Sequence, residues 1–304
     1  MIAQHHGASE RGFVIVAVLW LLAALAALAI VFTVYLANSA RTLSLNDSAL
    51  QTEALVSACV ELTAYQLRLA GEEDRPASGS FHTQLNGAEL FVTFVSETAR
   101  IDLNAAPKEL IKGLLTVLGA DQERANEFVD RIVAWRTKST IETSSKEDAL
   151  YRAAGVSYSP RQAPFEHVNE LALVLNLPPV LVERALPFVT VFSGASGIDA
   201  RNAAPEVVAA LPGMTPLKLK QFLNERASLS NEKDAVANAL GEGSSTAVAQ
   251  KSQAYRLSIG IHFRNGRETR SEVVISLRGE EDPYHILSWQ DGIPAPRQRA
   301  PTRS

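Results

Sequence analysis

The residues that come nearest to a catalytic pattern lie in two short stretches of the chain. "SGASG" (Ser193–Gly197) resembles a nucleophile elbow but lacks the Gly-x-Ser-x-Gly spacing. "KEDALY" contains the adjacent carboxylates of Glu147 and Asp148, a residue type used in general acid–base catalysis, but neighbouring acids of this kind usually form a solvated face. The sequence has no P-loop, no Gly-x-Gly-x-x-Gly and no His-Glu-x-x-His motif. We therefore predict no catalytic residues and a protein that is not an enzyme.

The residue types that bind metals are scattered along the chain. Cys59 is the only cysteine, which excludes an intramolecular disulfide, and it lies in the helical-looking stretch "ALVSACVELTAY". We expect it to be a small buried side chain. Of the six histidines only His5 and His6 are neighbours, and no Cys/His cluster has the spacing of metal ligands. We assign neither a metal nor a cofactor.

Paired short helices in the middle of the chain resemble helix-hairpin-helix modules. Those modules hold nucleic-acid phosphates on a hairpin with two glycines and on basic side chains. Each hairpin here, "VLGA" or "LPGM", has one glycine, Gly119 or Gly213. An acidic segment follows Gly119, whereas Lys218, Lys220 and Arg226 follow Gly213 as a small basic face. Because the formal net charge is -4, we expect a packing module without nucleic acid.

The strongest signal along the chain is an apolar run from Phe13 to Ala37. It contains no charged residue, and only Thr33 and Tyr35 carry a hydroxyl group. A helix of this length spans about 37 Å, enough for a bilayer core of about 30 Å and too long for the apolar core of a secretory signal. We predict one transmembrane helix. A short N-terminal segment before a large C-terminal part favours a cytoplasmic N-terminus.

Helical spacing of apolar residues continues beyond the apolar run, from Thr42 to about Leu69. The sequence therefore predicts one long helix over residues 13–70, of which 13–37 cross the membrane and the remainder is amphipathic. Turn-forming and charged residues from Gly71 to Ser80 end it.

Two β-hairpins are predicted, one on each side of a helical region. "FHTQL" and "ELFVTFV" flank Asn86-Gly87, and "AYRLSIGIHF" and "ETRSEVVISLR" flank Asn265-Gly266; Asn-Gly between alternating strands is a strong hairpin signal. "ARIDL" extends the first hairpin in this interpretation. The hairpins are expected to share one sheet, formed by residues 80–103 and 253–289.

Residues 104–252 are predicted to form an inserted helical domain with a weak internal repeat. "NAAPKEL" begins at Asn104 and "NAAPEVV" at Asn202, and an Ile-Asp pair precedes each. In each copy we expect Asn to cap a helix whose first turn contains the proline. Residues 168–189 form a third helix–turn–helix segment, residues 137–164 look loop-like, and the Pro- and Arg-rich residues 290–304 are expected to be a disordered tail.

These features together resemble a minor pseudopilin of the type II secretion system, namely the general secretion pathway protein K family. The resemblance covers nearly the whole chain. It includes the short polar leader before Phe13 and the motifs "RIDLNAAPKELIKGLL", "FVDRIVAWR", "PFEHVNELALVLNL", "LPFVTVFSG" and "GIDARNAAPEVVAALPGM". The family implies an α+β fold: a pilin-like long N-terminal helix and a small antiparallel sheet, with a large helical domain of helix-hairpin-helix or SAM-like type inserted.

The resemblance also implies how the N-terminus is processed. Residues 1–12 would be a leader, cut by prepilin peptidase between Gly12 and Phe13, and the new amino group of Phe13 would be methylated. Most pilin-like subunits have Glu at the fifth mature position, where its charge is thought to pair with the amine of a neighbouring subunit. Here that position is Ala17. A subunit without this charge suits the tip of a filament better than its middle.

The implied function is that of a tip subunit of the type II secretion pseudopilus, which primes assembly for export of folded proteins across the outer membrane. Expected partners are other minor pseudopilins, prepilin peptidase and the inner membrane, with the C-terminal domain in the periplasm. Family members can hold calcium in the large domain, but acidic residues are sparse in "TKSTIETSSK", and we assign no metal. The alternative is a membrane-anchored helix-hairpin-helix DNA-binding protein of competence type.

Overall fold

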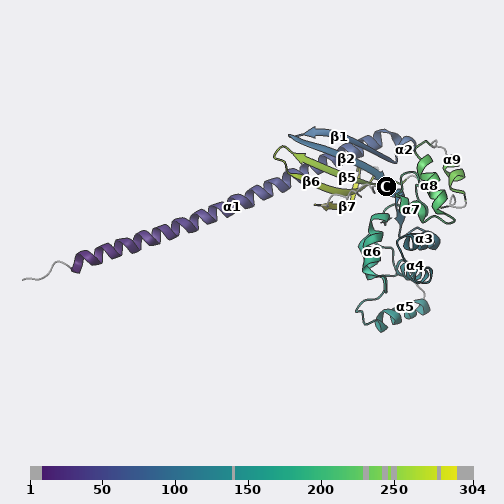
Figure 1. The fold of residues 1–304 in the computed structure, drawn as a ribbon, viewed down its shortest axis with the longest axis horizontal. Helices are drawn as coiled ribbons and strands as arrows, with labels where there is room; N and C mark the ends of the chain where they lie inside the picture. The colour runs from purple at the N-terminus through teal and green to yellow at the C-terminus, as the bar shows by residue number, and fades with distance from the viewer. Residues whose placement is uncertain are drawn as a thin grey trace, which may run out of the picture. The chain divides into compact units, whose positions relative to one another are not determined.

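The computed structural model describes residues 9–138, 141–228, 233–241, 246–247, 252–278 and 282–292 (Figure 1). Contacts divide the chain into two units, Met1–Ser57 and Ala58–Ser304. Helix α1 (Ser9–Leu69) has residues in both. No glycine or proline occurs between Phe13 and Leu69, so nothing in that segment interrupts helical hydrogen bonding. Gly71, with φ of 73°, follows the end of the helix, and α2 (Gly71–Asp74) adds one turn.

An antiparallel sheet of five strands forms part of the described chain of the second unit. Its order is β1-β2-β5-β6-β7, and the strands are β1 (Ser78–Leu85), β2 (Ala88–Ser96), β5 (Ala254–Phe263), β6 (Glu268–Ser276) and β7 (His285–Asp291). β2 pairs with β5 from Ala88↔Phe263 to Ser96↔Tyr255. The prediction that both hairpins share one sheet is therefore confirmed.

Turn chemistry and alternation explain the first hairpin. Asn86 and Gly87 have φ of 49° and 76°, the left-handed values that a two-residue hairpin turn of this type requires. Along β2, buried residues alternate with exposed ones, because successive side chains point to opposite faces of a sheet. One face of the sheet therefore belongs to a core, in which Leu90, Leu257 and Val273 are buried.

Helical elements occupy the chain between β2 and β5 and gather beyond one end of the strands (Figure 1). They are η1 (Glu97–Ala99), α3 (Lys108–Val117), α4 (Gln122–Arg136), α5 (Ile141–Ala153), η2 (Val168–Leu173), α6 (Pro179–Ala185), η3 (Leu186–Phe188), α7 (Pro205–Ala209), α8 (Pro216–Glu225) and α9 (Lys233–Leu240). The expected α+β fold with an inserted helical domain is thus confirmed.

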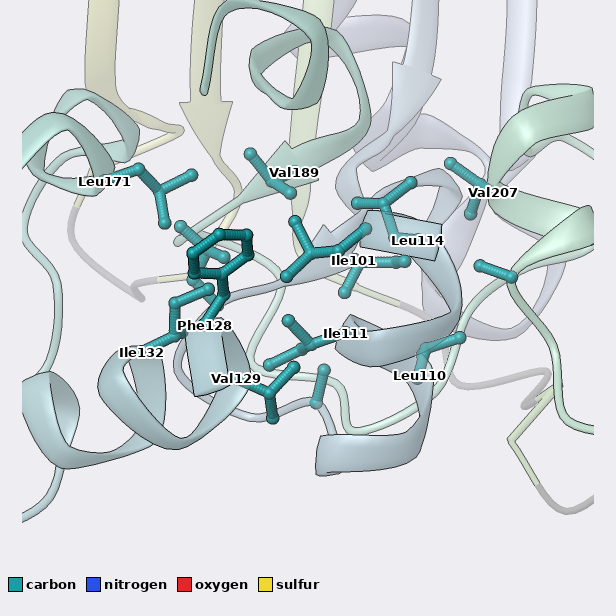
Figure 2. Packing of buried hydrophobic residues seen from close by; sticks show 14 of the residues in the cluster. Ile101, Leu110, Ile111, Leu114, Phe128, Val129, Ile132, Leu171, Val189 and Val207 are labelled. Atoms are coloured by element: carbon teal, nitrogen blue, oxygen red, sulfur yellow. The ribbon is translucent and has the colours of Figure 1, made fainter. Parts of the chain in front are cut away.

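The helical domain has its own hydrophobic core (Figure 2). Ile101 and Val189 come from two short strands at its centre, and Leu114 and Phe128 come from the α3–α4 pair. Each of these four side chains is less than 5% exposed. This core draws on segments almost ninety residues apart in the sequence, so the insert folds as a unit rather than as independent hairpins.

Four local expectations need correction. "ARIDL" does not extend the first hairpin: β3 (Ile101–Asp102) pairs in parallel with β4 (Val189–Thr190) in a separate sheet. The segment 137–164 is not all loop, because it contains α5. The first arm of the segment 168–189 is the 3₁₀ helix η2. The tail begins later than residue 290, since β7 continues to Asp291; residues 293–304 lie outside the described chain.

Glu170 stabilises the start of η2 through a capping box with His167. Burial alone would raise the pKa of its carboxyl, but the indole N–H of Trp135, the backbone N–H groups of Glu166 and His167, and the charge of Arg161 together hold this pKa below its usual value. A carboxyl with a lowered folded-state pKa stabilises the fold above the unfolded-state pKa, and this contribution is lost as the pH falls through the folded value.

Glu170→Gln is therefore expected to lower the stability of the helical domain by about 1 kcal/mol at neutral pH. The deficit should shrink once the pH falls below the folded-state pKa of Glu170, because the wild-type carboxyl is then protonated too. Thermal unfolding of the two proteins across this acidic range measures the effect. A deficit that stays the same at every pH would show that the charge of Glu170 contributes nothing.

Candidate partner-binding surface and membrane anchor

The N-terminal unit presents the apolar segment predicted from the sequence. Residues Phe13–Leu36 of α1 form one helix long and apolar enough to cross a membrane, and none of the side chains in its most apolar window is buried. The hydroxyl of Thr33 donates to the carbonyl oxygen of Ala29 at 2.8 Å, so this polar group is satisfied within its own helix, as a lipid environment demands. The segment fits a single-pass membrane anchor.

The predicted processing residues all lie in α1. The helix already includes Gly12, and Phe13 is 75% exposed. Ala17 is exposed too, one turn further along the same apolar segment. Residues 1–8 of the predicted leader lie outside the described chain. The bond between Gly12 and Phe13 therefore marks the point where the apolar segment begins, within one continuous helix.

A groove of about 990 Å³ lies in the second unit, between the last turns of α1 and the start of β7. Tyr65 and Leu69 line one wall and are 65% and 73% exposed, and Ile286 on the other side is 48% exposed. Large apolar side chains gathered in one concave surface are typical of protein-binding sites. Reasoning from the sequence found the apolar stripe of α1 but could not show that part of it stays uncovered.

Polar contacts hold the two walls of this groove together. The Arg68 guanidinium donates from Nη1 to the carbonyl oxygens of Asp282 and Pro283, at 3.2 and 3.0 Å. Partial burial raises the pKa of Tyr284, and the nearby carboxylate of Glu61 raises it further. The lining of the groove thus combines apolar side chains with the acidic Glu61 and Asp282 and the basic Arg68.

The sequence repeat corresponds to two similar turns. The backbone carbonyl of Asp102 accepts from the N–H of Ala106 at 2.9 Å, and that of Asp199 accepts from Ala203 at 2.9 Å. The Asn side chains do not cap helices as we expected. Instead Asn104 bonds the backbone of Phe165 in both directions, at 2.7 and 2.9 Å. The carboxylates of the two Asp residues accept from the N–H groups two residues further along and so hold each turn.

Each turn is also held by an arginine from later in the chain. Arg136 at the end of α4 donates to the carbonyl of Ala106 at 2.7 Å, and Arg226 after α8 donates to Ala203 at 2.8 Å. The second helix of each pair places a buried phenylalanine, Phe128 or Phe222, in the common core. The α3–α4 and α7–α8 pairs are therefore two copies of one helix-hairpin-helix unit.

This arrangement reduces the basic face that a nucleic acid would need. Arg226 holds its own turn, so only Lys218 and Lys220 of the predicted three stay exposed. Gly119 and Gly213 have φ of 106° and 70°, which explains the glycine in each hairpin. The N–H of Gly119 already bonds the carbonyl of Thr116 at 3.0 Å and does not serve as a free phosphate ligand.

The stretches that resembled catalytic patterns are structural. Ser193 Oγ and the Gly194 N–H both donate to Asp102 Oδ2, at 3.0 and 2.7 Å, which ties the "SGASG" loop to β3. Glu147 does not lie on a solvated face, because both its oxygens accept from Arg131 at 3.0 Å and its side chain is 23% exposed. Within the described residues no group of three or more His, Cys, Asp or Glu could hold a metal.

Comparisons with known proteins agree with this architecture. Residues 90–194 match the family model described as type II secretion system (T2SS), protein K. A chain in the crystal structure of the GspK-GspI-GspJ complex from the enterotoxigenic Escherichia coli type 2 secretion system aligns with a TM-score of 0.59 and 18% sequence identity, over 82% of this chain and 99% of that one. No curated protein matches. The resemblance to protein K is thus confirmed over residues 90–194, and no enzyme family is indicated.

Proposed function

Starting from the match to type II secretion system protein K, we propose that this chain is a minor pseudopilin at the tip of the type II secretion pseudopilus. There it primes pseudopilus assembly and so supports export of folded proteins across the outer membrane. The family match over residues 90–194 carries the proposal. The exposed apolar helix Phe13–Leu36 supports it, because a pseudopilin waits in the membrane before it assembles.

In this proposal prepilin peptidase removes residues 1–12 and the amino group of Phe13 is then methylated. The mature chain is held in the inner membrane by α1, with its N-terminus cytoplasmic and the second unit in the periplasm. Ala17 supports a place at the tip, since a carboxylate in lipid is stabilised only by a partner charge and alanine offers none to a neighbouring subunit.

The groove between α1 and β7 is the surface we propose for the other minor pseudopilins. Its exposed Tyr65 and Leu69 continue the periodic stripe of α1, and a helix of a partner subunit presents such a stripe in return. The similar crystal structure is a complex of GspK with GspI and GspJ, which supports partners of this class.

Tyr65→Asp is expected to weaken binding to the partner minor pseudopilins about tenfold or more, because a charged group replaces an exposed aromatic side chain in the proposed interface. Titration of the partners against the purified chain in detergent measures the loss. Since Tyr65 is 65% exposed, the change should leave thermal unfolding of the isolated chain almost unaltered.

Gln66→Asp provides the matched control for this experiment. Gln66 is an exposed neighbour of Tyr65 in α1 but does not line the groove, so its replacement adds the same charge to a different face. Equal partner affinities for the two variants and the wild type would contradict a partner site in the groove, while leaving the assignment to the family untouched.

The alternative function, DNA binding, would require the basic residues of α8 to hold nucleic-acid phosphates. We expect no retention of a short labelled duplex by the full chain at physiological salt, because Lys218 and Lys220 alone neutralise too few phosphates. Fluorescence anisotropy over a range of salt concentrations tests this. Salt-dependent binding that disappears in the Lys218→Ala/Lys220→Ala variant would favour the competence-type protein instead.

A further inference from the structure

A buried ion pair lies where the helical domain joins the sheet. The chain leaves the sheet at the end of β2, and Glu97 is the first residue beyond that strand. It returns in β5, whose third residue is Arg256. The Glu97 side chain is fully buried and that of Arg256 is 10% exposed. Glu97 and Arg256, one at each junction between the sheet and the inserted domain, therefore contact each other in the protein interior.

The contacts of Glu97 connect three parts of the chain. Arg256 donates from Nε to Glu97 Oε1 at 2.7 Å and from Nη2 to Oε2 at 3.1 Å, a two-pronged pair. Thr190 of β4, inside the helical domain, donates its hydroxyl to Glu97 Oε2. Arg256 also donates from Nη1 to Glu272 on β6. The helical domain and two central strands of the sheet thus share one hydrogen-bonded cluster.

Neighbouring groups extend the cluster along the same boundary. The N–H of Asp199, in the second repeat, donates to the carbonyl of Thr98 at 2.7 Å. Arg100 lies close enough that burial, and after it the charge of Arg256, lowers its pKa. The Ser78 hydroxyl on β1 donates a hydrogen bond to Asn202 Oδ1 at 2.6 Å. These contacts are directional, so they favour one angle between the domain and the sheet.

Buried ion pairs seldom add much to stability, because removing two charges from water costs about as much as their attraction returns. Their geometry is nevertheless strict, and the planar guanidinium of arginine meets a carboxylate in one arrangement only. From the position of this pair we propose that Glu97, Arg256 and Thr190 form a lock that fixes the orientation of the helical domain on the sheet. The lock keeps the helical domain and the sheet in one fixed relative orientation.

Distance measurements between spin labels on the full chain in detergent test the lock. Labels at Gln84→Cys on β1 and Glu123→Cys on α4 occupy exposed positions on either side of the boundary. The native Cys59 is buried, and burial raises its pKa to about 11, so it remains an unreactive thiol at neutral pH and need not be replaced.

The informative variant replaces both charges, Glu97→Gln with Arg256→Met. Side chains of similar volume keep the site filled, so we expect a folded protein of near wild-type melting temperature but a wider distribution of label distances with a shifted mean. An unchanged distribution would overturn the lock. Should this variant fail to fold, Arg256→Lys provides the second test, because lysine keeps the positive charge but lacks the planar guanidinium group. We expect Arg256→Lys to widen the distribution of label distances. An unchanged width would again overturn the proposal.

A second ion pair provides the matched control. Arg131 and Glu147 form a partly buried ion pair within the helical domain, with side chains 15% and 23% exposed, in which Arg131 Nη1 donates to both carboxylate oxygens. Replacing them as Arg131→Met with Glu147→Gln removes the same groups without touching the boundary. The label distances should stay as in the wild type. Equal widening in this control would mean that any lost ion pair loosens the molecule, and it would overturn a special role for Glu97 and Arg256.

Discussion

Gly113→Ala is expected to lower the free energy of unfolding by about 3 kcal/mol, through overpacking between two helices. Gly113 lies in α3, and a Cβ atom built on it would stand 2.0 Å from the carbonyl oxygen of Ala210 and 2.9 Å from its carbonyl carbon. Ala210 caps the C-terminal end of α7. Because both partners are backbone, no side chain can rotate away, and the α3–α7 contact must open. Thermal or urea unfolding measures the loss.

Gly260→Ala provides a control of the same chemistry. Gly260 lies in β5, where an added Cβ would meet only Phe91 atoms at 3.9 Å, an ordinary contact. We expect a change within about 1 kcal/mol in either direction, because alanine also restricts the unfolded chain. If Gly113→Ala is no more harmful than this control, the close approach of α3 to α7 is not present in solution.

Local signals explain why the sheet could be predicted. The two hairpins have Asn-Gly at their turns, and β2 of the first hairpin alternates between buried and exposed residues. Both features act over short stretches of sequence. The β3–β4 pair has neither: Ile101 and Val189 are far apart in the sequence, and each strand is two residues long. Only the shared core of the helical domain brings them together, so no sequence window contains the information.

The repeat was recognisable, but the role of its residues was not. Asn before a proline-containing first turn is a common cap, and this favoured Asn104 and Asn202. In the structure the carboxylates of Asp102 and Asp199 bond the turn N–H groups, and the Asn104 side chain binds Phe165 instead. Capping preferences cannot choose between two suitable side chains so close in the sequence when a distant segment competes for one of them.

Tertiary contacts also explain the helix α5 that the sequence did not reveal. Its composition is polar, which favours a loop, yet Tyr151 is 1% exposed and its hydroxyl accepts the Leu175 N–H at 3.0 Å. Together with the Arg131–Glu147 pair, this contact holds α5 against the rest of the domain. The groove was unpredictable for the same reason, since only the fold decides which part of an amphipathic stripe is covered.

Gly12→Trp should abolish processing of the N-terminus when the chain is produced together with prepilin peptidase. In the proposed processing step prepilin peptidase cuts the bond before Phe13, and the large indole group of tryptophan at position 12 would crowd that bond. The intact mass of the purified chain reports the outcome: the wild type loses residues 1–12 and gains a methyl group on Phe13, whereas the variant keeps its full length.

Gly7→Trp separates this effect from a general effect of a bulky residue in the leader. Gly7 belongs to the same polar segment but lies well before the proposed bond, so its replacement should leave the mature mass unchanged. A Gly12→Trp chain that still yields the mature mass would contradict the role of Gly12 in processing. A wild-type chain whose processed mass corresponds to cleavage at another bond would show that the leader ends elsewhere. The position of Ala17 would then no longer be the fifth mature residue, and the argument for the pseudopilus tip, which depends on the missing charge at that position, would fail with it.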